Sequence, residues 1–440
     1  MLKIREDSKN YTAQIIRLPV KQAVTGLDNL VECNYQGNSC LIGKDSDPDI
    51  LYIFFPAECQ ISHDFLNQNN LYRHSEFNQD KEKKGFFEDN RRVKSIKFKG
   101  VISTGFIIPL ESLNNLLIGH RFINQLNVGD EFNEIDGVEI CQKYIRPRER
   151  NKGMSNPKTK TLDSIVDSKF VPEHFDTSHL MKNLHKLNLT DTIVVSYKLH
   201  GTSARYYNTL VKRPLSRLER LAKWLGVKVQ EEQYDYIAAS RRVIKSCGFE
   251  ELPNKNHWFS TGDLWSEIGK EHFDGKLLQG EAIYCEIIGK TYKGEAIQHG
   301  YTYGFEKPKV YIYRIAMINS QGVEIDLSYQ QMKERARQLD VDICPELFYG
   351  NLKTFIFIKG NLDEFPLVED LEIDLNEIFY NELLEKPSIL DNSIIEEGFC
   401  IRVDKYPKPE IYKIKSKAFL LHEGIQLDKE VQDIEEEQTM

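Results

Sequence analysis

Short apolar segments separated by turn-forming residues run through the first part of the chain. Bounded by Gly, Asn and Asp, they lie at Tyr11–Val20, Leu30–Tyr35, Cys40–Gly43 and Ile50–Phe55. Segments of this length with such boundaries predict β-strands. Gln36-Gly37 separates two of them and has the composition of a tight hairpin turn. We therefore expect the N-terminal part to consist mainly of β-strands.

A further strand pattern lies within Arg91–Leu110, where Ile96 and Phe98 alternate with Lys97 and Lys99. Alternation places the apolar side chains on one face of a strand and the basic ones on the other. The basic face would suit a nucleic-acid backbone, although any solvated strand face has the same pattern. Several short strands at this spacing are typical of small barrels, so we predict an OB-like β-barrel, the common barrel that binds nucleic acids.

Strands and helices are mixed after residue 165. Apolar residues at helical spacing are Leu215, Leu218, Leu221, Ala222 and Leu225, followed by Gly226, and later Met332, Ala336 and Leu339. We expect both apolar stripes to face the core. Strands are predicted at Thr192–Tyr197, Ala282–Ile288, Val310–Ile315, Gly398–Val403 and Ile411–Ile414. The fold class indicated is α+β.

A basic stretch at Lys143–Lys160 separates these two parts. It has seven basic residues, the single acid Glu149, and Pro147, Gly153 and Pro157, so it is predicted to be an interdomain linker. It could follow a phosphate backbone or be a solvated hinge. The predicted domains are residues 1–160, OB-like and ending in this linker, and residues 161–440.

The net charge of −9, from 58 basic and 67 acidic residues, argues at first against a nucleic-acid partner. The charge is uneven, however. Residues 355–397, interpreted as a surface helix and loop, hold 12 acids and two Lys, and residues 428–440 hold six acids and one Lys. Without these stretches the chain carries +6, so a local basic groove and a nucleic-acid partner stay possible.

Length and composition exclude several classes of protein. With 440 residues, 40% of them hydrophobic, the chain can form two or three domains with substantial cores. No long uncharged apolar run predicts a membrane span, and the N-terminus has no secretory pattern. The eight Cys include no CxxC pair, which argues against a zinc ribbon or a disulfide scaffold. We expect a cytoplasmic protein.

The most informative local segment is Val194–Ser203, which places Lys198 at the end of a β-rich run, three residues before Gly201. Glycine allows a phosphate to approach the backbone closely. A lysine amine is a covalent nucleophile only when neutral, and a pKa near ~10.4 leaves about 0.1% neutral near pH 7.4. Desolvation or nearby positive charge would have to lower that pKa. Because Lys-x-x-Gly is common by chance, the hypothesis depends on other residues.

Later strands supply candidate companions for this lysine. Lys413 and Lys415 share one face of a predicted strand, where they would be either solvated or a clamp for a phosphate. Glu286 lies in an otherwise apolar strand and needs a partner. Tyr311 and Tyr313 share a face of another strand, which more often indicates core than a platform for stacking a base.

In chain order, these segments resemble the motif series of the covalent nucleotidyltransferases, which include ATP-dependent RNA and DNA ligases and mRNA-capping enzymes. The series is Lys198-Leu-His-Gly, Tyr-Cys-Glu286, Val-Tyr-Ile-Tyr313, Glu397-Gly and Lys413-Ile-Lys415. The likeness is greatest to ATP-dependent RNA ligases with an N-terminal OB domain, and it spans almost the whole chain. It implies that the second domain is a ligase adenylation (ATP-grasp-like) domain of antiparallel sheets flanked by helices.

The resemblance also implies roles for individual residues. Lys198 would attack the α-phosphate of ATP and form a covalent lysyl–AMP. The nucleotide site would further contain Gly201 and Thr202, Arg241 on phosphate or ribose oxygens, Glu286 on the ribose hydroxyls, and Tyr313 (or Tyr311, less favoured) on adenine. Glu397 would hold Mg²⁺ or Mn²⁺. Lys413 and Lys415 would bind the AMP phosphate and, with the metal, lower the pKa of Lys198.

The function implied is ATP-dependent sealing of 3′-hydroxyl and 5′-phosphate RNA ends, in nicked duplexes or broken strands, as in RNA repair. No membrane and no obligate protein partner is expected. Many ligases have Asp where His200 stands, so no role is assigned to His200. DNA ligases and capping enzymes generally carry the OB domain after the catalytic domain, and only 25 residues follow Lys415. The alternatives are a DNA nick-sealing ligase and a non-catalytic RNA-binding protein with a degenerate pocket; the intact set of motif residues argues against the latter.

Overall fold

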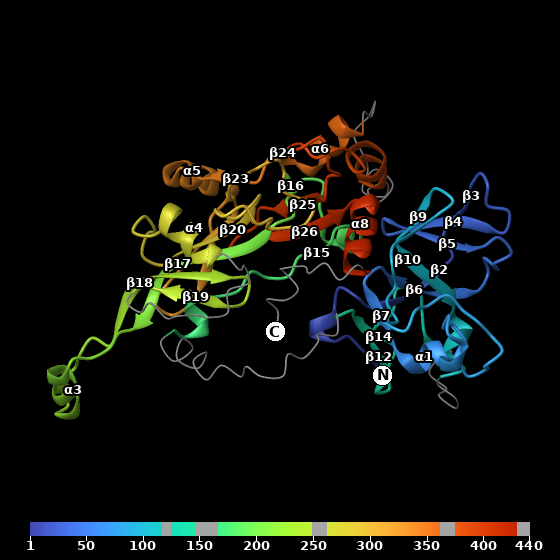
Figure 1. Cartoon of the computed structure of the whole chain (residues 1–440), viewed down its shortest axis with the longest axis horizontal. Coiled ribbons are helices and arrows are strands. Elements are labelled where there is room, and N and C mark those ends of the chain that lie inside the picture. The colour runs from blue at the N-terminus through green and yellow to red at the C-terminus, as the bar shows by residue number, and fades with distance from the viewer. Residues whose placement is uncertain (117–124, 146–165, 249–261, 361–374, 429–440) are drawn as a thin grey trace. The chain divides into compact units, whose positions relative to one another are not determined.

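The computed structural model describes residues 1–116, 125–145, 166–248, 262–360 and 375–428 (Figure 1). They form two compact units, one from Met1–Arg148 with Lys415–Glu430 and one from Glu149–Ile414. Both combine mainly antiparallel sheets with helices, so the α+β class is confirmed. The predicted boundary at residue 160, most of the basic linker and the acidic C-terminal stretch lie outside the described residues. Helix α8 (Lys417–Asp428), predicted to belong to the second domain, groups with the first unit.

The described strands of the first unit form several small sheets. The largest has the order β10-β6-β2-β11, from Gly105–Pro109, Leu51–Pro56, Ala13–Arg17 and Glu131–Phe132. The others are β1 (Leu2–Lys3), β12 (Glu134–Ile135) and β13 (Val138–Glu139); β3 (Lys21–Ala23), β4 (Leu30–Tyr35) and β5 (Asn38–Gly43); β7 (Cys59–Ile61) and β14 (Cys141–Lys143); β8 (Ile96–Phe98) and β9 (Val101–Ser103). Because no closed barrel forms among these strands, the OB fold is not confirmed.

Two local predictions in the first unit have opposite outcomes. The hairpin at Gln36-Gly37 is confirmed: both residues have positive φ (46° and 77°) and join the antiparallel pair β4–β5, as this turn requires. On β8, by contrast, Ile96 and Phe98 are 48% and 44% exposed. No apolar face of β8 is buried, because this strand pairs only with β9.

The short helices of the first unit are η1 (Glu6–Ser8), α1 (His63–Gln68), η2 (Ser75–Phe77) and η3 (Leu110–Leu113), in addition to α8. The main apolar cluster gathers Ile15 of β2, Phe55 of β6, Phe65 of α1 and Phe132 of β11, all fully buried. Sheet and helix thus share one core. No helix in the described ranges is long and apolar enough to cross a membrane.

The second unit contains two large sheets. The five-stranded sheet has the order β15-β26-β25-β16-β24, from Ser178–His179, Glu410–Lys415, Gly398–Val403, Thr192–Lys198 and Glu346–Asn351. The other has the order β19-β18-β17-β20-β21-β22, from Ile244–Cys247, Glu232–Ser240, Thr202–Lys212, Glu281–Ile288, Lys309–Ile318 and Glu324–Asp326, with β23 (Asp342–Ile343) also on β21. The helices are η5 (Ser168–Phe170), η6 (Met181–Lys186), α3 (Arg217–Trp224), α4 (Leu264–His272), α5 (Tyr329–Leu339), α6 (Leu352–Lys359) and η8 (Glu377–Leu383).

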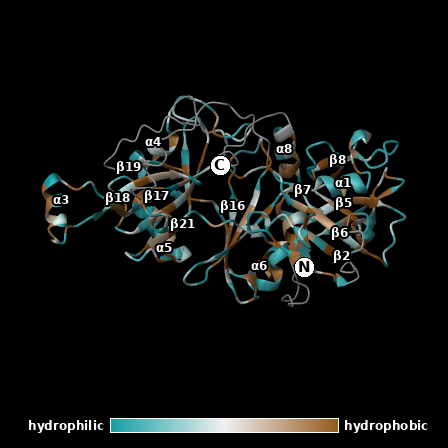
Figure 2. Ribbon diagram, turned by 90° about the horizontal axis from the view of Figure 1, so that it is seen from below, coloured by the Kyte–Doolittle hydropathy of each residue, from teal (hydrophilic) through white to brown (hydrophobic). Residues whose placement is uncertain are grey.

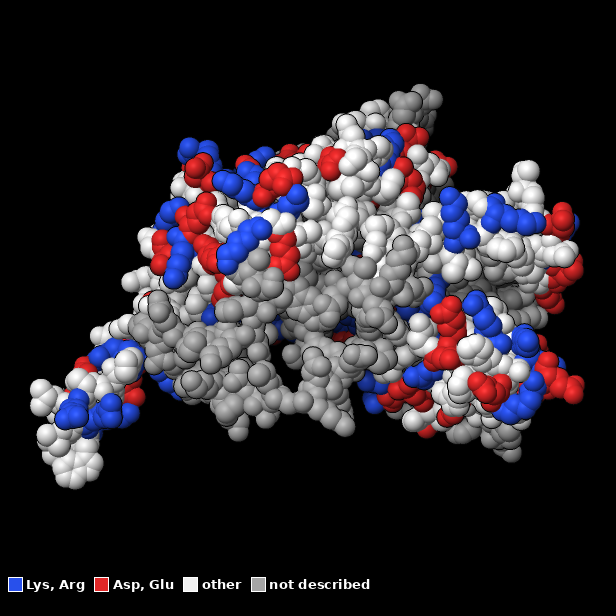
Figure 3. Space-filling view, viewed as in Figure 1, with Lys and Arg blue, Asp and Glu red and all other residues white. Residues whose placement is uncertain are grey.

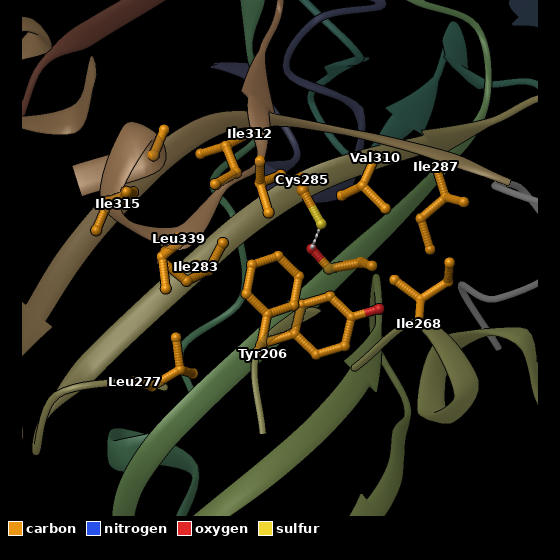
Figure 4. Close-up of a cluster of buried hydrophobic side chains, with 14 of the residues drawn as sticks. Tyr206, Ile268, Leu277, Ile283, Cys285, Ile287, Val310, Ile312, Ile315 and Leu339 are labelled. Carbon is orange, nitrogen blue, oxygen red and sulfur yellow. Dashed lines mark hydrogen bonds between the residues drawn. The ribbon is translucent and has the colours of Figure 1, made fainter. Parts of the chain in front are cut away.

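The core of the six-strand path lies between the sheet and helices α4 and α5. In Figure 4, Ile283, Cys285 and Ile312 of the sheet face Ile268 of α4 and Leu339 of α5. The predicted core stripe of α5 is confirmed, since Met332, Ala336 and Leu339 are all buried. The acidic 355–397 stretch was expected to lie on the surface, but part of it is buried. Ile378 and Phe379 of η8 belong to the apolar core next to the five-stranded sheet.

Helix α3 overturns the other core prediction. It forms where expected, with a Ser216–Glu219 capping box, but it lies at the tip of the long β17–β18 hairpin (Figures 1 and 2). Leu218, Leu221 and Leu225 are 79%, 52% and 65% exposed. Uncharged and basic side chains share its visible surface (Figure 3). Periodicity specifies which residues share a helix face, but not whether another element covers that face.

Candidate functional site

Lys198 lies at the end of β16, beside the start of β25. The two strands pair in antiparallel register, with Lys198 opposite Gly398. Its Nζ is 2.6 Å from Oε1 of Glu397, whose side chain is 1% exposed. Lys198 and Glu397, two residues of the predicted motif series, are about 200 positions apart in the sequence and in direct contact in the structure. Glu397 thus gives Lys198 a negatively charged neighbour, and the lowering of its pKa by Lys413, Lys415 and a metal stays a prediction.

The turn after Lys198 is fixed by three side chains. Glu286 of β20 accepts a hydrogen bond from the Gly201 N–H (3.0 Å), which provides the partner predicted for this carboxylate. Gln298 donates to the Gly201 carbonyl (2.8 Å), and the Tyr303 hydroxyl accepts from the His200 N–H (2.7 Å). A Cβ on Gly201 would lie 2.3 Å from the Ile287 carbonyl oxygen. The close approach of β20 therefore requires glycine at position 201. From the sequence, we expected glycine here because a phosphate would approach the backbone.

The surroundings of Cys400 on β25 show that four predicted charges converge. Burial raises the pKa of the Cys400 thiol to about 11. The positive charges of Lys198 and Lys413 act to lower that pKa, and the carboxylates of Glu397 and Glu286 act to raise it. All four act on one thiol, and electrostatic influence decays with distance. They therefore lie in the same region, which includes β25 of one sheet and β20 of the other.

Lys413 connects this region to Arg241. On β26, Lys413 pairs in register with His179 of β15, and burial, followed by the charge of Lys413, lowers the pKa of His179 to about 4. Burial acts to raise the pKa of the nearby Asp176 carboxyl. The positive charges of Arg241, Lys413 and Arg242 outweigh the effect of burial, so the pKa of Asp176 is lowered. Arg241 is 2.9 Å from Asp176. The positive charges of Arg241, Lys413 and Arg242 therefore all lie near Asp176.

Lys415 has a different environment. Its Nζ is 3.0 Å from Oε1 of Glu423 on α8, within the first unit. Ile414, between the two lysines, is fully buried, as the alternation predicts. The shared phosphate clamp of Lys413 and Lys415 stays a prediction.

Aromatic residues flank the Glu286 end of the site. The Tyr313 hydroxyl is 2.9 Å from the Ser203 Oγ, and Ser203 is directly opposite Glu286 in the β17–β20 ladder. Thr202 is fully buried at the start of β17. In the β20–β21 ladder Tyr311, but not Tyr313, is directly opposite Glu286. The His174 ring lies 5.1 Å from the Tyr313 ring, edge to face.

Sequence reasoning missed several members of this arrangement. None of Asp176, His174, Ser203, Gln298 and Tyr303 had an assigned role. These residues act through contacts between distant segments. The only available signal was the glycine- and tyrosine-rich composition of Gln298–Gly304.

The site contains few groups that could bind a metal. No cluster of three or more potential ligands occurs within the described ranges. Glu397 provides one carboxylate among cations. Such a donor set fits a hard divalent ion that takes its other ligands from nucleotide phosphates and water.

Glu396, next to the candidate metal ligand, makes stability depend on pH. Burial raises the pKa of this 1%-exposed carboxyl from 4.5 to about 7. The folded protein then binds a proton that the unfolded chain has already lost, so the free energy of unfolding should fall as the pH rises from about 5 to 8, by about 3 kcal/mol at most. Urea titrations across this range should show the fall, and Glu396→Gln should flatten it. An unchanged slope in Glu396→Gln would contradict the assignment.

Comparisons with known proteins identify the family and a similar fold. A model of the RNA ligase family matches residues 191–415, just over half of the chain. The fold is similar to that of Naegleria gruberi RNA ligase: a mutant with ATP and Mn matches at TM-score 0.54 and 16% identity over 94% of this chain and 99% of that chain. The same enzyme with PPi matches at TM-score 0.54 and 16% identity over 95% and 98%. No curated protein sequence matches.

Proposed function

Because the chain belongs to the RNA ligase family, we propose that it is an ATP-dependent RNA ligase that joins 3′-hydroxyl and 5′-phosphate RNA ends, as in RNA repair. The observation that carries the proposal is the contact of Lys198 with Glu397, next to a turn held by Glu286. A lysine at a strand end among several charged groups is suited to covalent capture of a nucleotide. The solved structures with ATP, AMP and Mn belong to a protein of similar fold.

In the first step, Nζ of Lys198 attacks the α-phosphorus of ATP. A P–N bond forms, the P–O bond to pyrophosphate breaks, and the amine gives up a proton. An oxygen of the RNA 5′-phosphate then displaces the lysine from AMP. Finally the RNA 3′-hydroxyl attacks the activated 5′-phosphate, which forms the phosphodiester and releases AMP.

The chain's own residues orient ATP for this attack. Glu286 would accept from the ribose hydroxyls, Tyr313 would stack on adenine, and Lys413 with Arg241 would neutralise phosphate oxygens. Gly201 and Thr202 would line the pocket at the start of β17. Lys415 would join Lys413 if its amine exchanged Glu423 for the phosphate.

Glu397 would hold the divalent metal, Mg²⁺ or Mn²⁺. When bound, such an ion supplies charge neutralisation on phosphoryl oxygens. Lys198 cannot keep its ion pair with Glu397 while it attacks phosphorus. The amine must therefore leave Glu397 before it attacks.

Covalent labelling tests the proposal. The protein is incubated with α-labelled ATP and Mg²⁺, denatured in detergent and treated with acid. We expect label that survives detergent and is released by acid, as a phosphorus–nitrogen bond should be. Absence of label would favour the non-catalytic RNA-binding protein. Sealing of nicked duplexes with RNA or DNA 3′-ends then decides between an RNA and a DNA ligase, and equal use of all-DNA nicks would contradict our choice.

A second prediction concerns the adenine platform. Replacing Tyr313 by Leu should weaken ATP binding about tenfold, because an aromatic stack on a base contributes roughly 1–3 kcal/mol. Tyr313→Phe should bind ATP almost as wild type, since it keeps the ring that would stack on adenine. Calorimetric titration with ATP measures both. A larger loss in Tyr311→Leu than in Tyr313→Leu would assign the platform to Tyr311.

A further inference from the structure

A long connection in the first unit has an ordered conformation with little secondary structure of its own. It runs from Asn69, after α1, to Ser95, before β8, and contains only the 3-10 turn η2. Connections longer than about 12–15 residues without their own elements are uncommon in compact domains and are often functional. The connection from Asn69 to Ser95 is therefore a candidate functional segment.

Buried polar contacts hold the connection in place. The fully buried Asn78 accepts from the Tyr72 N–H and donates to the carbonyls of Tyr72 and Lys83, at 2.8–2.9 Å. A Cβ on Gly85 would lie 2.1 Å from the Leu71 carbonyl oxygen, so this backbone crossing requires glycine. A loop fixed in this way presents its side chains in one arrangement, which lowers the entropy lost when a ligand binds.

The connection and the start of α1 border an open cavity of about 300 Å³, lined by His63, Tyr72, Phe77, Asp89 and Arg91. Its walls are aromatic. The Tyr72 ring lies 5.5 Å from the rings of both His63 and Phe77, and the Tyr72 hydroxyl is 2.8 Å from Nδ1 of His63. Phe77 is 37% exposed. The cavity is large enough for a planar heterocycle and offers rings against which it could stack.

Arg91 gives the rim a positive charge. Its backbone has a φ of 61°, held by bonds from the Arg91 N–H to Glu88 and from the Ile61 N–H to the Arg91 carbonyl. A left-handed conformation is unfavourable for a residue with a long side chain and is retained where surrounding structure enforces it. Within the described chain, its guanidinium has no hydrogen bond or ion pair. It is available to an anion.

Asp89 adds an acceptor beside this cation. One carboxylate oxygen, Oδ1, is 2.9 Å from Nδ1 of His74, which leaves Oδ2 for another donor. The rim thus combines a guanidinium, which suits a phosphate, with a carboxylate, which suits a hydroxyl. A carboxylate would repel a bare phosphate, so the combination favours a ligand with phosphate and hydroxyl groups at separate positions.

We propose that this cavity binds one nucleotide of single-stranded RNA, with the base stacked on Phe77, the phosphate at Arg91 and the ribose 2′-hydroxyl at Asp89. The inference rests on the proposed function and adds to it a substrate site in the first unit. It supplies a way to distinguish RNA from DNA, since only the 2′-hydroxyl donates to Asp89. A free ribonucleotide carries the same three groups, so its binding is measured separately below.

Binding of a labelled single-stranded RNA without ligatable ends tests the proposal. Phe77→Ala should weaken RNA binding about tenfold. Arg91→Asn, which tolerates the left-handed backbone, should weaken it and reduce the salt dependence by about one ion. Asp89→Asn should lower RNA affinity toward that for the same DNA sequence and leave DNA binding unchanged. Matched controls on the same connection are Phe86→Ala and Lys84→Ala, an exposed ring and an exposed cation outside the cavity, both expected to bind as wild type.

The proposal is overturned if the cavity variants melt normally and bind RNA as the controls do. It is also overturned if they lose binding of free AMP or ATP while RNA binding persists, which would assign the cavity to a free nucleotide. Labelling of Lys198 by ATP should be unchanged in every variant. If ATP failed to label the wild-type protein, the proposed ligase function would be contradicted. Loss of the RNA site and loss of the ligase function can therefore be distinguished.

Discussion

Replacing Lys198 by Ala is expected to reduce covalent labelling by ATP by more than about a thousandfold, because the proposed P–N bond forms on its Nζ. Removing the ammonium also leaves Glu397, 1% exposed, without its partner at 2.6 Å. A loss of labelling in this variant could therefore reflect unfolding, and a second variant is needed.

Lys198→Arg separates the two explanations. Arginine keeps a positive charge beside Glu397, but its guanidinium stays protonated and is not a nucleophile. We expect Lys198→Arg to melt near the wild-type temperature and still fail to label. Lys290→Arg is the control, since Lys290 pairs with the 78%-exposed Glu306 and has no assigned role in the site. If Lys198→Arg retained covalent label, Lys198 would not be the nucleophile.

Replacing Arg314 by Leu is expected to lower the free energy of unfolding by about 3–5 kcal/mol, the usual result of removing one member of a buried charge network. The fully buried Arg314 contacts Asp326 at 2.6 Å and Glu324 at 2.9 Å. Glu324 also accepts from Tyr284 and Lys408. Loss of the guanidinium would leave two buried carboxylates poorly compensated. Urea denaturation monitored by circular dichroism measures the effect.

Arg337→Leu provides the control for this stability prediction. Arg337 pairs with Glu334 at 2.8 Å, but its side chain is 75% exposed. Exposed pairs contribute little because water and salt screen them, so we expect no measurable change. If Arg314→Leu were equally harmless, the network would have no structural role.

Local sequence signals predicted much of the second unit. β25 forms over Gly398–Val403 as expected, and β16 ends at Lys198, one residue beyond the prediction. These strands are buried and rich in β-branched residues, so their composition reflects their surroundings. The contact of Lys198 with Glu397 required more, namely the antiparallel register of β16 and β25, which depends on pairing between segments far apart in the chain.

The sequence was least informative where exposure matters. Leu218 and Met332 lie in equally periodic helices, yet one is 79% exposed and the other 2%. Lys413 and Lys415 share a strand face, yet Lys415 pairs with Glu423 of a helix that follows it. In each case the partner, or its absence, comes from another element, and no local pattern encodes it.

By itself the sequence determined the α+β class, five strands of the second unit, the hairpin at Gln36-Gly37 and the likeness to covalent nucleotidyltransferases, because spacing and composition record which residues share a face or a turn. Tertiary structure alone decided the partner of each charge: Glu397 for Lys198, Asp176 for Arg241 and Glu423 for Lys415. Electrostatic interactions depend on distance and burial, and both are set by how distant strands and loops pack.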